Sequence, residues 1–210
     1  AKGLQPHLLT MTATPIPRTL ALSLHGDLDV SQIDELPPGR KPIITTLISS
    51  SERNKAYKLI KEKAENGQRT YFVLPLVEES EKLDLRSAVE VHRELSTDIF
   101  PELEVALLHG RMNSVDKSKV IEDFVIGRSQ ILVSTTVIEV GVDVPDATLM
   151  VIDHADRFGL SQLHQLRGRV GRGSTNSHCI LINDTQNTNS RKRLQVLVNC
   201  TDGFEISEID

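Results

Sequence analysis

The run TYFVLPLV, residues 70–77, decides the fold of this chain. It is apolar nearly throughout, as expected of a strand that helices cover on both faces. The runs QILVSTTV at 130–137 and TLMVIDH at 148–154 have the same character, and a helix is expected around 85–95. Strands that alternate with helices form βαβ units. The sequence therefore predicts an α/β fold with a mainly parallel sheet between two layers of helices.

Shorter signals extend this pattern in both directions along the chain. Ser49 and Glu52 have the spacing of a capping box, which predicts a helix that ends near Gly67. Asn113 is a suitable cap for another helix, which we expect to stop near Gly127. Three further strands and a final helix are expected at 43–48 (IITTLI), 105–110 (VALLHG), 178–184 (HCILIND) and 191–200 (RKRLQVLVNC).

The run LPPGRKP, residues 36–42, is the clearest boundary in the sequence. Its prolines stiffen the backbone and remove amide donors, so neither a helix nor a central strand is expected to continue through it. The part before the boundary contains another expected strand, HLLTMTAT at 7–14. We therefore expect the boundary to join two structural units.

Composition limits the possible functions. The chain has 210 residues, of which 39% are hydrophobic and 25% charged, and its net charge is −5. This charge argues against holding nucleic acid by bulk electrostatics, and 3% aromatic residues without Trp argue against a base-stacking surface. Cys179 and Cys200 form no CxxC pair, which favours a reduced, cytoplasmic setting and no metal site. No apolar run is long enough to cross a bilayer, and the start at Ala1 without Met indicates part of a longer protein.

The clearest chemistry lies in the run QLHQLRGRVGRG. Gln165, Arg169 and Arg172 stand at i, i+4 and i+7, so on a helix all three would project from one face. Gly168 and Gly171 lie between them, and a glycine inside a helix costs about 1 kcal/mol relative to alanine, which indicates close approach by a backbone or a ligand. Paired guanidinium groups are suited to phosphate oxygens. The alternative for this pattern is a solvated basic helix face.

Several loops fall where a parallel sheet binds its ligands, beyond the carboxyl ends of the strands. Four of them follow expected strands: VEESEK, HGRM, TTVIEVGVDVP and ADRFGLSQ. The arginine-bearing segment follows the last of these loops. We therefore expect all of the functional segments along one edge of a sheet formed by residues 43–190.

Four segments together resemble the motifs of superfamily-2 helicases, namely TATPIPRTL at 12–20, LLHGRM at 107–112, ILVSTTVIEVGVDVP at 131–145 and RFGLSQLHQLRGRVGRG at 157–173. Within that superfamily the chain is similar to the bacterial ATP-dependent DNA helicases that act on branched DNA. The transcription-repair coupling translocases share two of the motifs, but IDELPPGRKP, EESEKLDL and HGRM favour the branched-DNA group. The resemblance covers essentially the whole chain. It implies a RecA-like three-layer sandwich, the P-loop NTPase-type helicase C-terminal domain.

The resemblance also implies a division of the chain: 1–36 as the tail of a first RecA-like domain, 37–42 as a hinge linker, 43–190 as the second RecA-like domain, and 191–210 as the start of a C-terminal segment. The family's phosphate-binding loop and magnesium ligands would precede Ala1, so ATP with Mg would be bound mainly by the missing part of the first domain. The wedge domain that recognises branched DNA would also be missing. The implied partners are those domains and branched duplex DNA at forks and Holliday junctions, with no membrane.

The implied site residues fall into four groups. Those that couple nucleotide state to DNA binding are Thr12, Ala13 and Thr14. Those that contact nucleic acid are Gly110, Arg111, Thr135 and Thr136. Those that bind the nucleotide cofactor are Gly141, Asp143, Gly168 and Gly171. The catalytic group is Gln165, Arg169 and Arg172, with Arg172 as the arginine finger.

Simpler interpretations of these residues stay open. From the residues alone, 12–14 could be a strand-end turn, Arg111 a solvated loop arginine, and Asp143 a turn residue before Pro145. His164, next to this motif, is expected to be a helix-packing or surface residue and not a catalyst. The alternatives for the whole chain are the transcription-repair coupling translocase and a non-catalytic RecA-like interaction module.

Overall fold

The computed structural model describes residues 40–76, 81–135, 144–185, 187–203 and 205–206, together with residues 9 and 31. The strand expected at 7–14 lies outside these ranges apart from Leu9. Six of the predicted site residues also lie outside the described residues: Thr12, Ala13, Thr14, Thr136, Gly141 and Asp143.

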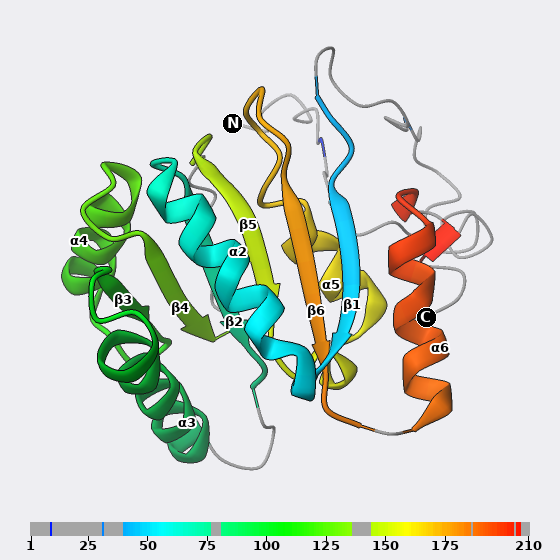
Figure 1. Ribbon diagram of the computed structural model, residues 1–210, viewed down its shortest axis with the longest axis horizontal. Coiled ribbons are helices and arrows are strands. Elements are labelled where there is room, and N and C mark those ends of the chain that lie inside the picture. The colour runs from blue at the N-terminus through cyan, green and yellow to red at the C-terminus, as the bar shows by residue number, and fades with distance from the viewer. Residues whose placement is uncertain are drawn as a thin grey trace, which may run out of the picture.

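The described residues form one sheet of six parallel strands in the order β1-β6-β5-β2-β4-β3 (Figure 1). The strands are β1 Ile44–Ser49, β2 Arg69–Leu74, β3 Val105–Leu108, β4 Ile131–Thr135, β5 Ala147–Ile152 and β6 His178–Asn183. Each coincides with one of the runs that predicted a strand to within one residue at the ends that extend beyond it. The expected α/β fold with a parallel sheet is therefore confirmed.

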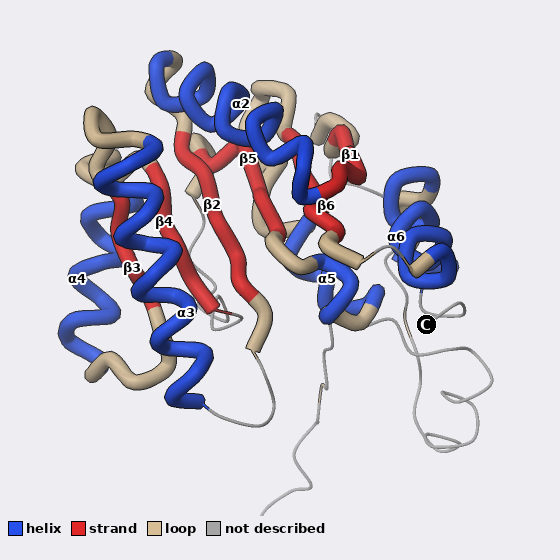
Figure 2. Tube along the Cα trace, turned by 60° about the horizontal axis from the view of Figure 1, so that its bottom comes forward, coloured by secondary structure: helices blue, strands red, loops and turns tan. Residues whose placement is uncertain are grey.

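Helices cover both faces of the sheet (Figure 2). They are α2 Arg53–Glu65, α3 Glu81–Glu94, α4 Ser114–Val125, α5 Leu160–Arg167 and α6 Thr188–Asn199, with the short segments η1 Ser50–Glu52, η2 Leu95–Ile99 and η3 Ala155–Arg157. Two hydrophobic clusters fill the space between the layers, and the central strand β2 contributes to both. Tyr71 packs in the cluster that contains residues of α4, α5 and α6, and Phe72 packs in the cluster with α2 and α3. The predicted burial of this strand on both faces is therefore confirmed.

The expected helix ends are also confirmed. The Asn113 side chain accepts a hydrogen bond from a backbone N–H in the first turn of α4. The backbone N–H of Ser49 donates to the Glu52 carboxylate at 3.2 Å, which opens η1 and, directly after it, α2. Gly67 and Gly127 follow α2 and α4 with φ values of 71° and 81°. Glycine adopts this left-handed conformation without steric cost, so these residues end the two helices.

Candidate functional site

The arginine-bearing segment does not continue as a helix. Helix α5 ends at Arg167, Gly168 is its C-cap, and Gly171 has a φ of 77°. The prediction that Gln165, Arg169 and Arg172 project from one helical face is therefore wrong. Gln165 lies on α5, whereas the two arginines belong to residues 168–173, which we call the arginine loop. Glycines next to the last helical turn end helices more often than they sit within them.

The arginine loop lies at the amino edge of the sheet. It leads into the first residue of β6, His178, and β6 runs parallel to β5. The segments HGRM and ADRFGLSQ instead follow the last residues of β3 and β5 and lie at the carboxyl edge, as expected. The expectation that all functional segments share one edge is therefore wrong for Arg169 and Arg172, because α5 carries the chain back across the sheet before they occur.

A residue of the linker holds the arginine loop. The Arg40 guanidinium donates from Nε to the carbonyl oxygen of Gly171 at 3.1 Å. Its Nη2 atom donates to the carbonyl oxygens of Gly168 at 3.2 Å and Val170 at 3.4 Å. Sequence reasoning missed this contact, because the acceptors are backbone atoms 128 to 131 residues later in the chain.

Two other segments approach the same loop closely. A Cβ atom on Gly171 would lie 2.9 Å from Cγ1 of Ile43, and one on Gly173 would lie 2.9 Å from the carbonyl oxygen of Pro145. At these separations a side chain at either position would force its neighbour to shift, so close approach by a side chain at Gly171 and by backbone at Gly173 favours glycine at both. At Gly171 the close neighbour is therefore the Ile43 side chain and not the backbone or ligand that was expected, and at Gly168 the nearest atoms belong to the preceding helical turn.

The side chains of the arginine loop differ in exposure. Arg172 is exposed, whereas Arg169 and Gln165 are partly buried. Val170 between the two arginines is fully buried in the core beneath α5. The buried valine anchors the loop, and the Arg172 side chain lies at the protein surface.

Arg167 has a structural role that its neighbours do not share. It is 4% exposed and donates from Nη1 to the carbonyl oxygens of Leu197 at 2.7 Å and Cys200 at 2.9 Å. Its Nη2 lies 2.9 Å from Nδ1 of His164, which must accept. Burial lowers the pKa of Arg167, and burial followed by the charge of Arg167 lowers the pKa of His164. His164 is therefore a neutral acceptor for Arg167 of the same helix, which agrees with a helix-packing residue.

Three of the four residues predicted to contact nucleic acid are described, and they lie at the opposite edge. Gly110 and Arg111 follow β3 and Thr135 ends β4, and these two strands are neighbours in the sheet. Arg111 is exposed, and Lys117 donates to the carbonyl oxygen of Gly110 at 2.8 Å. Thr135 is 2% exposed, and within the described residues its hydroxyl has no hydrogen-bond partner. Contact between Thr135 and a phosphate stays a prediction.

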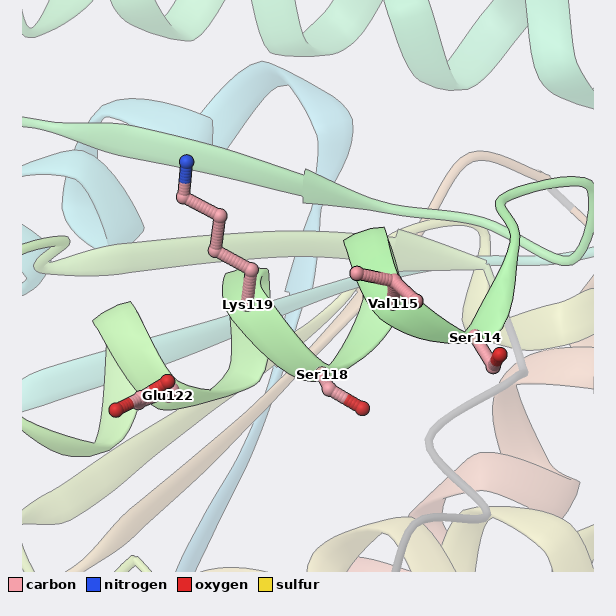
Figure 3. Close-up of a pocket in the computed structure, with 5 residues that line it drawn as sticks. All are labelled: Ser114, Val115, Ser118, Lys119 and Glu122. Carbon is pink, nitrogen blue, oxygen red and sulfur yellow. The ribbon is translucent and has the colours of Figure 1, made fainter.

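A further surface feature follows Gly110 and Arg111 in the chain. An open pocket runs along α4, lined by Ser114, Val115, Ser118, Lys119 and Glu122 (Figure 3). Among the described residues, no three His, Cys, Asp or Glu side chains gather as a metal site requires. Within the same part of the chain, no helix is both long and apolar enough to span a membrane.

Comparisons with known proteins agree with the motifs. Residues 51–174 match the family described as helicase conserved C-terminal domain. Over its full length the chain is 57% identical to the ATP-dependent DNA helicase RecG of Synechocystis sp. and 54% identical to that of Aquifex aeolicus. It spans only 25% and 27% of those two proteins.

Solved structures give the same result. The structure of RecG bound to a three-way DNA junction has a TM-score of 0.80 and 45% identity, with 93% of this chain and 25% of that chain covered. S. cerevisiae Dbp5 bound to RNA and ADP BeF3 has a TM-score of 0.61 at 17% identity, with 91% of this chain and 47% of that chain covered. The second likeness extends to the fold alone.

Proposed function

Because the chain belongs to the helicase conserved C-terminal domain family, we propose that it is the second RecA-like motor domain of an ATP-dependent DNA helicase. Residues 43–190 would form this domain, 37–42 the hinge, 1–36 the tail of the first motor domain, and 191–210 the start of a C-terminal segment. The intact protein would be cytoplasmic. It would use ATP hydrolysis to migrate branches at stalled forks and Holliday junctions, in DNA repair and recombination.

One observation carries this proposal: the contact of Arg40 with the arginine loop. The linker enters the domain at Arg40, so a preceding domain would attach on this side of the sheet. The exposed Arg172 lies in the loop that Arg40 contacts. An arginine at such a place can reach a phosphate that a neighbouring domain holds. This is what an arginine finger requires.

Each residue of the arginine segment would have a separate task. Arg172 would stabilise the charge that spreads over the transferred phosphoryl group, and Arg169 would bind the same phosphate from a less exposed position. Gln165, on the last turns of α5, would orient the attacking water. Gly168 and Gly171 would bring the backbone close to the nucleotide. Asp143, with Gly141 before it, would accept a hydrogen bond from the ribose.

The metal would be held elsewhere. Mg²⁺ would neutralise charge on the β- and γ-phosphates when bound with ATP. The described part of this chain offers no acidic cluster for it, so we propose that the carboxylates of the first domain hold it. In this scheme the charged groups that the second domain offers to the phosphates are the two arginines of its loop.

The carboxyl edge of the sheet would contact the DNA. Gly110, Arg111, Thr135 and Thr136 would meet the phosphate backbone, which positions a duplex without reading its sequence. Thr12, Ala13 and Thr14 would transmit the nucleotide state to this contact. Since the arginine loop lies at the other edge of the sheet, nucleotide and DNA would be bound by separate surfaces. Closure of the two motor domains on ATP and their reopening would move the DNA.

The test is DNA-stimulated ATP turnover by the full-length protein. Arg172→Ala should lower turnover by a factor on the order of 10³–10⁵, while DNA affinity without nucleotide stays near the wild-type value. Arg128→Ala is the control, because Arg128 is an exposed arginine whose salt bridge to Asp123 lies at the end of α4. Near-normal turnover in Arg172→Ala would exclude the arginine finger. The isolated chain should not hydrolyse ATP, because it lacks the phosphate-binding loop.

A further inference from the structure

Arg40 holds the one stretch of backbone that carries both functional arginines. Its three acceptors, the carbonyls of Gly168, Val170 and Gly171, lie on either side of Arg169 and directly before Arg172. The amide groups of Gly168 and Val170 still bond to carbonyls within α5. The carbonyls that Arg40 binds belong to residues after the last helical residue of α5. A planar guanidinium donates in several fixed directions, so it can fix the course of such a loop in a way that a single donor cannot.

A second contact supports the same coupling between linker and loop. Ile43, three residues after Arg40, fills the space that a side chain on Gly171 would occupy. Directly after it, the backbone N–H of Ile44 donates to the carbonyl oxygen of Ser177 at 2.9 Å. The chain from Arg40 to Ile44 therefore follows the arginine loop with polar and apolar contacts. Because close-packed contacts transmit displacement, a movement of the linker also shifts the loop.

Resting on the function proposed above, we propose that Arg40 is a positioning residue for ATP hydrolysis: it holds the arginine loop so that Arg172 and Arg169 face the neighbouring domain, and it transmits the position of the linker to them. Arg40 itself does not touch the nucleotide. Its role is to hold the cationic Arg172 in position before the reaction. Misplacement of a catalytic group by about 1 Å lowers rates by about 10²-fold.

The experiment uses the full-length protein and measures kcat and the KM for ATP in the presence of saturating DNA. Arg40→Ala should lower kcat by about 10–100-fold. The KM for ATP should change less than threefold, because the first motor domain provides most of the nucleotide binding. Lys41→Ala is the matched control, since Lys41 is an adjacent exposed cation of the linker, and its kcat should stay within twofold of wild type.

A double variant separates positioning from simple loss of structure. If Arg40 acts through Arg172, then Arg40→Ala should lower turnover in an Arg172→Ala background by less than threefold, because residues that act as one unit are not additive. The full 10–100-fold loss on top of Arg172→Ala would overturn the inference. So would a kcat of Arg40→Ala within twofold of wild type.

A milder substitution keeps the test decisive if Arg40→Ala fails to fold. Arg40→Lys retains a cation at the end of α5 but replaces the planar fork with a point charge. A folded Arg40→Lys protein should lose at least about fivefold in kcat, and unchanged turnover would overturn the inference. The two proposals fail separately: normal turnover in Arg172→Ala removes the finger, whereas a loss in Arg172→Ala without one in Arg40→Ala or Arg40→Lys removes only the positioning role.

Discussion

Arg53 and Asp153 form a bidentate ion pair at the carboxyl edge of the sheet. Nη1 of Arg53 lies 2.9 Å from Oδ2 of Asp153, and Nη2 lies 2.6 Å from Oδ1. The Asp153 side chain is 2% exposed and that of Arg53 is 26% exposed. Burial opposes the charge on Arg53, but the neighbouring carboxylate more than offsets it, so the pKa of Arg53 is raised. The pair ties the start of α2 to the end of β5.

Removing either member of this pair should destabilise the protein by unequal amounts. Arg53→Ala leaves a carboxylate buried without its cation, which costs about 3–5 kcal/mol. Asp153→Ala leaves a guanidinium that can turn towards water, so about 1–3 kcal/mol is expected. Urea unfolding of the isolated chain followed by circular dichroism measures both values. Equal losses, or a larger loss in Asp153→Ala, would contradict the argument from burial.

Two glycines with the same backbone conformation should respond differently to alanine. Gly67 and Gly171 have φ values of 71° and 77°. A Cβ atom on Gly67 would meet nothing within 4 Å, whereas one on Gly171 would lie 2.9 Å from Ile43. Gly67→Ala should cost about 1–2 kcal/mol of unfolding free energy from the backbone alone. Gly171→Ala should cost about 2–4 kcal/mol, because overpacking is added. The same unfolding measurement compares them, and identical costs would show that the Ile43 contact relaxes freely.

Stability should fall as the pH drops below about 6.5, the ordinary pKa of histidine. Burial lowers the pKa of His164, and burial is also the largest cause of the lowered pKa of His109 and His178. In this window the unfolded chain binds more protons than the folded one, so the unfolding free energy rises with pH and is lost on acidification. His164→Gln keeps an acceptor for Arg167 and should reduce the slope between pH 7 and 5.5. An unchanged slope would mean that His164 titrates normally in the folded state.

The separation of the two edges predicts distinct effects on DNA binding. In the full-length protein, Arg111→Ala should weaken duplex binding to a similar degree for all sequences. It should also make the dependence of log affinity on log salt shallower by about one unit. Arg128→Ala should leave both quantities unchanged, as the matched exposed arginine. Fluorescence anisotropy across a salt series provides the measurement. A change in sequence preference, or an unchanged slope, would argue against a phosphate contact by Arg111.

Local signals predicted the scaffold well, and the reason is physical. Strands such as β2 are apolar because both faces are buried, and caps such as Asn113 are chosen by hydrogen bonds within one turn. Both effects act over a few residues, so they are visible in the sequence. Gly168, directly after the last periodic residue of α5, was also a local signal for a helix end. The repeating spacing of Gln165 and the arginines concealed it.

The contacts around the arginine loop could not be predicted in the same way. Arg40 binds backbone carbonyls, which every residue has, so its partners leave no mark on the sequence. The edge on which the loop lies depends on where α5 ends, since a helix that crosses the whole sheet reverses the edge. The sequence identifies Arg169 and Arg172 as candidate phosphate-binding residues, but only the three-dimensional path of the chain shows that they lie near the linker.

The pairing of β1 with β6 has a consequence for how the domain is made. In the described sheet, β1 is an edge strand whose neighbour is β6, and Ile44 is in register with His178. Of the described strands, β1 therefore leaves the ribosome first, but it can pair only after β6 has been synthesised last. Pairings between such distant residues slow folding, because the entropy of closing a long loop is lost before any contact stabilises the pairing. The inner strands can assemble earlier during synthesis, and the side of the domain that carries the linker is completed last.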